Sequence, residues 1–208
     1  KKLLAAYGIL SPCEDMARSA DEAAAIATRM GFPVVAKVVS PDLPHKSDVG
    51  GVILNVKTAA EAAEAYRRIE ASLATLPDKP SMEGVLIAKM AAAGLELVLG
   101  ASRDPEMGPL ILFGSGGITI ELFKDVALSA APLDEERAHE LIARTHAGAL
   151  AAGYRGSKPL DMRALISALV GLSNLMMDAR GRIASIDVNP FLLRENGGLA
   201  LDGLVVRE

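Results

Sequence analysis

Lys37 lies in the middle of a short β-branched segment, residues 34–39, which predicts a buried strand. Side chains alternate between the faces of a strand, so Lys37 shares a face with Val35 and Val39. Burying an ammonium group without a partner costs several kcal/mol, a large part of a total stability of about 5–15 kcal/mol. A bound phosphate would offset this cost. The alternative is an edge strand from which the lysine reaches into solvent.

A loop rich in proline and glycine is predicted directly after this strand, over residues 40–51. Gly50 and Gly51 could bring successive backbone N–H groups close to phosphate oxygens, although two glycines are also ordinary turn residues. His45 and Lys46 lie in the same loop. The imidazole of His45 is either a solvated loop side chain or a nucleophile or acid–base group at the phosphates.

A second glycine-rich segment, residues 113–118, follows an apolar run. The backbone amides of Gly116 and Gly117 could hold phosphate, and a flexible β-turn is the alternative. Glu96 is an acidic residue within another apolar run. Its partner could be Lys37, a ribose or a metal ion, and an exposed strand face would explain it equally well.

A hairpin is predicted near the C-terminus, where the apolar segments 183–193 and 199–206 flank Asn-Gly at 196–197. Asn-Gly between apolar runs is the strongest short hairpin signal. If the turn has two residues, counting outward from it places Phe191 opposite Asp202. A change of one residue in the turn length would move Asp202 to the other face.

Three oxygen-bearing side chains converge in this predicted hairpin. Asp187 and Asn189 are two residues apart and share a strand face with Phe191, so Asp202 lies diagonal to Asn189 and within its reach. Carboxylate and amide oxygens suit Mg²⁺, which binds one or two protein ligands together with nucleotide phosphates. The hairpin therefore predicts a Mg²⁺ site, and polar residues on a solvated face are the alternative.

The elements that must position these residues indicate an α+β fold with two lobes and mostly antiparallel sheets. Helices are expected over residues 21–30, 59–76, 134–145 and 162–179, after a short N-terminal helix that Gly8 ends. Strands are expected over residues 34–39, 52–56, 84–90, 96–101, 109–113, 183–193 and 199–206. The small lobe is expected to span residues 18–88 and the large lobe residues 1–17 and 89–208.

The composition excludes several classes of protein. The net charge of −4 argues against a general nucleic-acid-binding protein. No apolar run approaches the roughly 18–20 residues of a membrane helix. Cys13 is the single cysteine in 208 residues, so no intrachain disulfide can form and a cytoplasmic location is expected. Because no initiator Met or N-cap precedes the first helix, the sequence is expected to be a piece of a longer chain.

The runs at residues 31–41 and 45–52 match a known family; they read GFPVVAKVVSP and HKSDVGGV. The sequence resembles the ATP-grasp domain of ADP-forming (NDP-forming) acyl-CoA synthetases and, more distantly, the β subunit of succinyl-CoA synthetase. Weaker shared motifs follow in order along essentially the whole chain, at residues 94–100, 103–105, 108–109, 116–117, 153–156 and 187–190.

The resemblance implies an ATP-grasp fold, with Mg²⁺ and ATP or ADP bound between two lobes. Lys37 would contact the phosphates, and Glu96 would lie at the nucleotide. His45 would be a second phosphohistidine, carrying phosphate between the acyl-CoA site and the nucleotide, with Lys46 holding that phosphate. The resemblance also assigns Asn189 and Asp202 as Mg²⁺ ligands, with Asp187 beside them. The overall reaction would be acyl-CoA + ADP + phosphate ⇌ carboxylic acid + CoA + ATP.

Two departures from the family accompany this resemblance. The segment where the family reads adenine usually carries Gln or Glu, whereas this chain has Lys89 followed by Met90. Their backbone groups could still contact adenine. The CoA-binding domain and the domain with the first phosphohistidine are absent from the sequence, so a CoA-binding α-type domain or subunit is the expected partner, in a hetero-oligomer or a fused chain.

Two other functions fit the same residues. Related chains fused to acetyltransferase domains act in regulation, so the chain could be a nucleotide-binding regulatory domain. It could also be a stand-alone ATP-grasp ligase or kinase with another acceptor.

Overall fold

The structure is a computed structural model that describes residues 1–43, 46, 48–117 and 124–208. The chain divides into two compact units. Unit 1 comprises Lys1–Ser11 together with Ala93–Glu208, and unit 2 comprises Pro12–Ala92. The boundaries differ from the expected small lobe, 18–88, because the N-terminal strand of unit 2 pairs with its last strand and therefore belongs with it.

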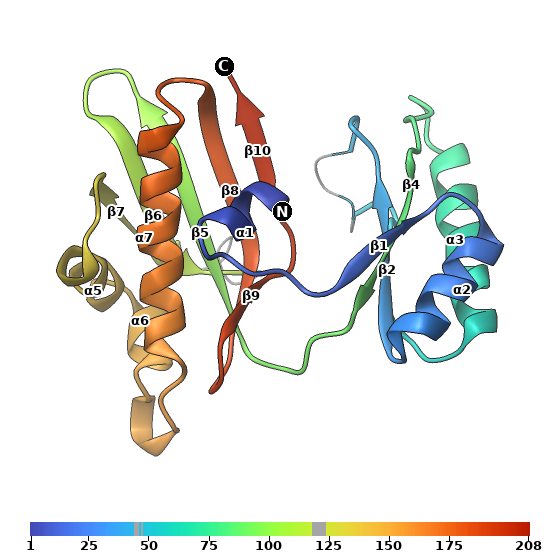
Figure 1. The fold of residues 1–208 in the computed structure, drawn as a ribbon, viewed down its shortest axis with the longest axis horizontal. Coiled ribbons are helices and arrows are strands. Elements are labelled where there is room, and N and C mark those ends of the chain that lie inside the picture. The colour runs from blue at the N-terminus through green and yellow to red at the C-terminus, as the bar shows by residue number, and fades with distance from the viewer. Residues whose placement is uncertain (44–45, 47, 118–123) are drawn as a thin grey trace. The chain divides into compact units, whose positions relative to one another are not determined.

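Unit 2 is a four-stranded antiparallel sheet with two helices (Figure 1). The strand order is β1-β4-β2-β3. The strands are β1 (Glu14–Ala17), β2 (Val34–Val39), β3 (Val52–Val56) and β4 (Gly84–Lys89), and the helices are α2 (Ala20–Met30) and α3 (Ala59–Ala74).

Local signals define the helices of unit 2. The hydroxyl of Ser19 accepts from the backbone N–H of Glu22 at the start of α2, and the hydroxyl of Thr58 caps α3 in the same way. Gly31 ends α2 with φ +75°, a conformation that favours glycine. The alternate residues of β2 that face the helices join one apolar cluster with them. One face of the sheet is therefore fixed in the core, which leaves the other face for polar side chains.

Unit 1 is built on a six-stranded antiparallel sheet in which β10-β8-β5-β6-β7 form the main path and β9 pairs with β8. The strands are β5 (Leu95–Asp104), β6 (Gly108–Ser115), β7 (Val126–Ala130), β8 (Ile183–Leu193), β9 (Gly198–Ala200) and β10 (Leu204–Arg207). The helices are α1 (Lys2–Ala6), α5 (Glu135–Ala143), α6 (His146–Ala151), the 3-10 turn η1 (Tyr154–Gly156) and α7 (Met162–Asp178).

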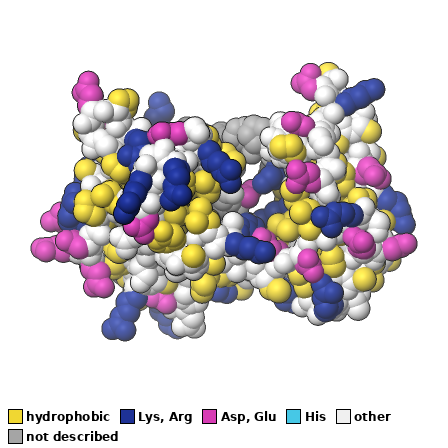
Figure 2. All heavy atoms as spheres, turned by 45° about the horizontal axis from the view of Figure 1, so that its top comes forward, with side chains coloured by type: hydrophobic (Ala, Val, Ile, Leu, Met, Phe, Trp, Pro, Cys, Tyr) yellow, Lys and Arg dark blue, Asp and Glu magenta, His cyan; other side chains and the backbone are white. Residues whose placement is uncertain are grey.

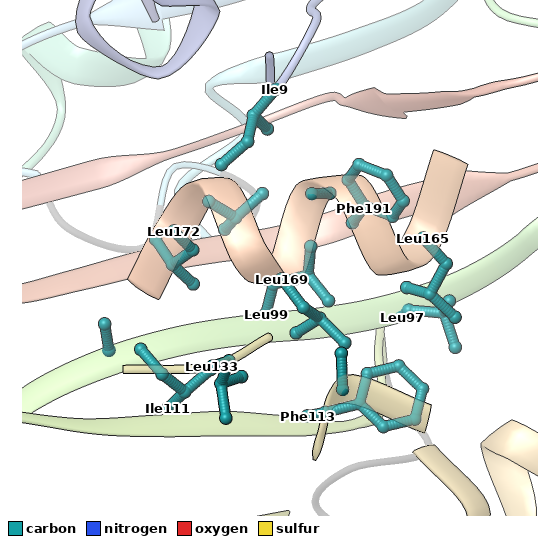
Figure 3. Close-up of a cluster of buried hydrophobic side chains, with 14 of the residues drawn as sticks. Ile9, Leu97, Leu99, Ile111, Phe113, Leu133, Leu165, Leu169, Leu172 and Phe191 are labelled. Atoms are coloured by element: carbon teal, nitrogen blue, oxygen red, sulfur yellow. The ribbon is translucent and has the colours of Figure 1, made fainter. Parts of the chain in front are cut away.

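The core of unit 1 lies between α7 and the sheet (Figure 3). Leu165, Leu169 and Leu172 recur at helical spacing on α7 and are fully buried. They pack over Leu99 of β5 and its neighbours. Burial of each such side chain contributes about 1.5–3 kcal/mol, so this layer holds the strands that carry the candidate site.

Most of the expected elements are present, with shifts of a few residues at their ends. The expected strand 199–206 is instead two strands, β9 and β10, separated at residues 201–203. Among the described elements, β1, β7, α6 and the 3-10 turn η1 were not expected. The antiparallel arrangement expected for closely spaced strands is confirmed for β5 and β6, whereas β4 belongs to the sheet of unit 2.

Figure 2 shows that the visible face of each unit carries both acidic and basic side chains. Within the described part of the chain, no helix combines the length and apolarity required to cross a membrane.

Candidate functional site

Lys37 lies on an internal strand. β2 pairs with β3 on one side and β4 on the other, and Lys37 is opposite Val52 and Leu86. The edge-strand alternative is therefore wrong. Val34, Ala36 and Val38 belong to the core, and Lys37 is half-buried on the opposite face. A cation on the interior strand of a sheet, on the face without helices, suits an anionic ligand.

The glycine pair after β2 has structural reasons of its own. Gly50 adopts φ +70°, in the left-handed region that favours glycine. A Cβ on Gly51 would lie 2.6 Å from a methyl group of Val38 and 2.7 Å from the carbonyl oxygen of Lys46. The backbone N–H of Gly51 donates to that same oxygen at 2.8 Å. The Gly51 amide is thus engaged inside the loop, not presented as part of an anion nest.

His45, Pro44 and Ser47 lie outside the described residues. Lys46 is described and half-buried.

Lys89 and Met90 are used within unit 2. The ammonium group of Lys89 donates to the carbonyl oxygens of Gly31 at 2.8 Å and Phe32 at 3.1 Å. A lysine near the C-terminal end of α2 also complements the helix dipole. The backbone N–H groups of Lys89 and Met90 donate at 2.9 and 3.2 Å to carbonyl oxygens of residues 13 and 33, respectively. Neither amide is left to donate to an adenine ring in this conformation.

Four predicted site residues of unit 1 lie together. The N–H of Gly116 donates to the carbonyl oxygen of Glu96 at 3.0 Å, which fixes the start of the glycine-rich segment against β5. The N–H of Gly117 donates to Oδ1 of Asn189 at 3.3 Å. Gly117 has φ +61°, and a Cβ there would collide with the carboxylate of the exposed Glu96. β5, β6 and β8 thus bring a carboxylate, two glycines and an amide into one cluster.

The turn predicted at 196–197 is longer than two residues. The observed pairs are Leu193 with Gly198 and Phe191 with Ala200, so the turn has four residues. Within this turn, the backbone N–H of Arg194 donates to the carbonyl oxygen of Gly197. The prediction that Phe191 lies opposite Asp202 is therefore wrong.

The prediction that Phe191 shares a face with Asn189 is also wrong. The pairing of β8 with β5 shifts between Leu97 and Leu99, and the extra residue in β8 breaks the alternation. Val188 and Phe191 are both buried, and Phe191 joins the core. Asp187 and Asn189, on either side of buried Val188, remain on the face away from the core.

The strand register keeps Asn189 and Asp202, two of the residues expected to bind Mg²⁺, at facing positions along the chain. Asp187 pairs with Leu204 and Phe191 with Ala200, so Asn189 and Asp202 both fall in the interval between these pairs. Among the described residues there is no cluster of three or more His, Cys, Asp or Glu able to hold a metal. The expected set has two carboxylates and one amide, and its oxygen atoms have the chemistry that Mg²⁺ prefers.

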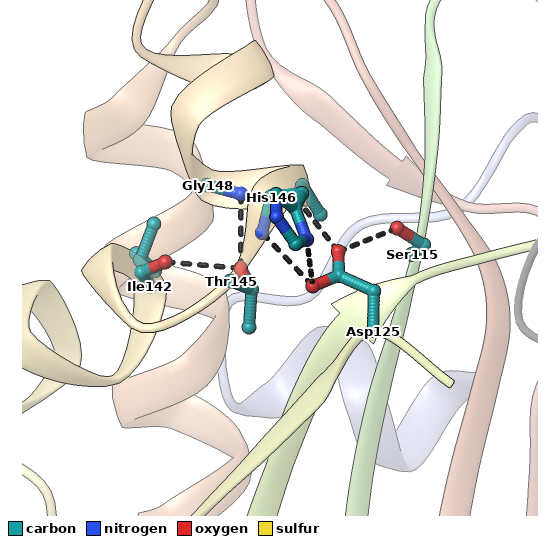
Figure 4. A network of polar contacts seen from close by, with 7 residues as sticks. Ser115, Asp125, Ile142, Thr145, His146 and Gly148 are labelled. Atoms are coloured by element: carbon teal, nitrogen blue, oxygen red, sulfur yellow. Dashed lines mark hydrogen bonds and ion pairs between the residues drawn. The ribbon is translucent and has the colours of Figure 1, made fainter. Parts of the chain in front are cut away.

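Asp125 was missed by sequence reasoning. Its side chain, 8% exposed, accepts hydrogen bonds from the Ser115 hydroxyl and from the backbone N–H groups of His146 and Ala147 (Figure 4). Burial works against ionisation of Asp125, but these hydrogen bonds outweigh it and hold the pKa of the carboxyl below its usual value. The available signal was an acidic residue just after the glycine-rich segment.

A hollow of about 390 Å³ lies elsewhere in unit 2. Its lining residues are Tyr66, Glu70, Leu73, Ala74, Lys79, Pro80 and Met82. None of the described residues predicted to bind nucleotide lines it, so it is not assigned to that site.

The comparison with protein families decides the identity of the chain. Residues 1–206 match the sequence model of the ATP-grasp domain. The chain belongs to the ATP-grasp domains of ADP-forming acyl-CoA synthetases. The ATP-grasp domain is 38% identical over 206 residues to the beta subunit of acetate–CoA ligase [ADP-forming] I from Pyrococcus furiosus, which covers 99% of this chain and 88% of that subunit.

A second relative of this ATP-grasp domain is a longer protein. Acetate–CoA ligase [ADP-forming] I from Archaeoglobus fulgidus is 42% identical over 200 residues, which are 96% of this chain and 29% of that protein. The chain thus spans most of the Pyrococcus subunit and under a third of the Archaeoglobus protein. The expected ATP-grasp fold is confirmed.

Solved structures of one relative contain nucleotide analogues. Acetyl-coenzyme A synthetase 1 of Ca. Korarchaeum cryptofilum, in complex with coenzyme A and Ca-AMPCP, superposes with a TM-score of 0.94 at 36% identity, covering 100% of this chain and 90% of that one. Another structure of that protein, with Mg-AMPPCP, has a TM-score of 0.84 at 35% identity, covering 99% and 88%. Its phosphohistidine segment points towards the nucleotide-binding site.

Proposed function

We propose that this chain binds ADP or ATP with Mg²⁺ and passes a phosphoryl group between the nucleotide and His45, as the nucleotide half of an ADP-forming acyl-CoA synthetase. The observation that carries the proposal is the cluster in which the Gly117 N–H meets Asn189 while Gly117 lies against Glu96. Its combination of backbone amides, an amide oxygen and a carboxylate suits a nucleotide and its metal. The nucleotide analogues bound by the Korarchaeum relative support the same assignment.

The proposed step at this chain is phosphoryl transfer. In the ATP-forming direction, the N–P bond of phosphorylated His45 breaks and a terminal phosphate oxygen of ADP bonds to the phosphorus. The imidazole regains its lone pair, so charge and atoms balance without another reactant. Phosphoryl transfer depends on positioning and charge compensation. Lys37, fixed on an internal strand, would hold phosphate oxygens, and Lys46 would hold the phosphate on its neighbour.

Mg²⁺ would be held by Asn189 and Asp202, with Asp187 beside them. Asn189 and Asp202 both lie between the strand pairs Asp187–Leu204 and Phe191–Ala200. Carboxylate and amide oxygens fit a hard cation. When bound, Mg²⁺ neutralises phosphate charge during the transfer. Because Oδ1 of Asn189 accepts from Gly117, the same side chain would connect the metal with the glycine-rich segment.

Adenine would be contacted by the backbone of Lys89 and Met90. Their N–H groups are already bonded within unit 2. We therefore expect their backbone carbonyl oxygens to accept from the adenine amino group. The side chain of Lys89 is bonded to Gly31 and Phe32 and has no part in this proposal.

The chain would act with a CoA-binding α-type domain or subunit that carries the first phosphohistidine. The whole reaction is acyl-CoA + ADP + phosphate ⇌ carboxylic acid + CoA + ATP. A regulatory nucleotide-binding domain is the second candidate, favoured by Lys89 at the position where the family usually has Gln or Glu.

The proposal is tested on the full-length protein together with any separate CoA-binding subunit. ATP formation is followed after adding acyl-CoA esters of different chain length, ADP, phosphate and Mg²⁺, with phosphate omitted in the control. We expect ATP that depends on all four additions. Nucleotide binding by calorimetry without ATP formation would favour the regulatory candidate, and absence of both would contradict the proposal.

A further inference from the structure

One buried carboxylate, that of Asp125, links the end of β6 to the start of α6. Oδ2 of Asp125 accepts from the Ser115 hydroxyl at 2.8 Å and from the N–H of Ala147 at 2.8 Å. Oδ1 accepts from the N–H of His146 at 2.9 Å. Ser115 precedes Gly116 directly, so Asp125 ties the end of β6 to the first turn of α6 (Figure 4).

Backbone contacts tighten the same junction. The N–H of Ser115 donates to the carbonyl oxygen of Asp125 at 3.0 Å. A Cβ on Gly114 would collide with that carbonyl oxygen, so only glycine allows this close approach. Side-chain and backbone bonds therefore fix Ser115 from two directions. The next two residues, Gly116 and Gly117, start from an anchored position.

The anchored residues lead directly into the candidate nucleotide cluster. Gly116 and Gly117 donate to Glu96 and Asn189, respectively. A small shift of Ser115 would move both amides relative to these partners.

We propose that Asp125 is a positioning residue for nucleotide binding, which holds Ser115 so that the Gly116 and Gly117 amides keep their place beside Glu96 and Asn189. The proposal rests on the proposed function, because it assumes that this cluster contacts ADP or ATP. Asp125 does not itself touch the nucleotide in this account.

The carboxylate of Asp125 is well suited to hold Ser115 in one position. Taking an ionised carboxylate out of water is unfavourable unless its oxygens are fully bonded. The two Asp125 oxygens receive three donors from two elements, which no neutral side chain of this size could accept equally well. An asparagine would turn an N–H₂ group toward one of the two backbone donors of α6.

The side chain of His146 provides a matched control. Its ring nitrogen Nδ1 lies 3.2 Å from Oδ1 of Asp125, but the side chain is 95% exposed. His146→Ala removes this contact and keeps the backbone N–H that Asp125 accepts. We expect it to leave nucleotide binding unchanged.

The test measures ADP binding and turnover in the full-length protein with any separate CoA-binding subunit. Asp125→Asn is expected to raise the KM and the Kd for ADP about tenfold. Its kcat should stay within about twofold, because loss of binding that is equal in ground and transition states changes KM alone. Simple unfolding would instead lower the active fraction and leave KM unchanged.

A second pair of variants tests the Ser115 contact. Ser115→Ala should raise the KM for ADP several-fold. Ser115→Thr keeps the hydroxyl, so its KM for ADP should stay close to that of the unchanged protein. These variants also carry the test if Asp125→Asn does not fold. Unchanged KM in both Asp125→Asn and Ser115→Ala would overturn the proposal, as would equal loss in Ser115→Ala and Ser115→Thr. If the unchanged protein binds no ADP, the proposed function fails first, and the positioning role fails with it.

Discussion

The two glycine pairs, Gly50 with Gly51 and Gly116 with Gly117, follow strands in different units and are held in different ways. Gly51 is enclosed by Val38 and donates its N–H back into its own loop. Gly117 donates to the Asn189 side chain on another strand. One pair closes a turn, and the other connects three strands of its sheet.

This difference separates a glycine whose N–H bonds within its own loop from glycines whose N–H groups bond to neighbouring strands. In unit 2, the proposed phosphate contact is the side chain of Lys37, and the Gly51 amide bonds within its own loop. In unit 1, the Gly116 and Gly117 amides are bonded as well, but Gly117 bonds to the side chain of Asn189, a proposed Mg²⁺ ligand. A glycine pair after a strand is therefore weak evidence for a phosphate site until the partners of its N–H groups are known.

The largest expected effect comes from Gly116→Ala. Its Cβ would lie 2.5–2.8 Å from backbone atoms of Leu97, which cannot move without disturbing the central strand β5. We expect the free energy of unfolding to fall by about 3 kcal/mol. Gly50→Ala, in an exposed position, should lose only about 1 kcal/mol from its left-handed conformation. Urea unfolding measures both, and equal losses would contradict the distinction between the pairs.

The next largest effect is expected for Lys37→Met. Loss of a charged hydrogen bond to phosphate should weaken ATP binding by about 2 kcal/mol, or roughly 30-fold, while the fold is retained. Lys57→Met, at an exposed lysine just beyond β3, is the matched control. Calorimetry at fixed ionic strength measures both affinities. Equal affinities in the two variants would remove Lys37 from the phosphate site.

Asp161→Asn tests whether carboxylates hold the turns of unit 1. Asp161 accepts from the N–H of Ala164 at the start of α7 and from the N–H of Gly197 in the β8–β9 turn. These bonds hold its pKa below the ordinary value of 3.8. We expect the substitution to lower the free energy of unfolding by about 1 kcal/mol at neutral pH.

The stability that Asp161 contributes should depend on pH. Because the pKa of Asp161 is lower in the folded state, its contribution is fully present above pH 3.8 and is lost as the pH falls through the folded pKa. The difference between the unchanged protein and Asp161→Asn should therefore shrink on acidification. Glu195→Gln, at an exposed ion pair of the same turn, should change stability little at either pH. A difference that stays constant with pH would contradict the role of the charge.

The smallest expected effect is that of Lys89→Met. Loss of the bonds to Gly31 and Phe32 should lower the free energy of unfolding by about 0.5 kcal/mol. ADP affinity should not change, in contrast to Lys37→Met. A large loss of ADP affinity in Lys89→Met would place its side chain at the nucleotide after all.

Local patterns predicted the elements that carry the candidate site. The β-branched run around Lys37, the helix N-caps and the apolar spacing of α7 all act within a few residues, so they are visible in the sequence. Resemblance to a known family supplied the fold and the nucleotide chemistry. The clusters within each unit needed the structure, because their members come from strands far apart in the chain.

Tertiary contacts explain the failures. The Asn-Gly signal predicted a two-residue turn, but Asp161 bonds Gly197 and a longer turn forms. β1 was missed because Glu14 and Asp15 hide the apolar alternation of a strand that is defined by pairing with β4. Asp125 was missed because its partners on α6 become neighbours only on folding.

The most direct test of the central claim is phosphorylation of His45. The full-length protein, with any separate CoA-binding subunit, is incubated with γ-labelled ATP and Mg²⁺, and acid-labile phosphate is located by peptide mapping. The account predicts label on His45 that His45→Asn abolishes and that His139→Gln, at an exposed helical histidine, retains. Absence of label, or label that persists in His45→Asn, would contradict it.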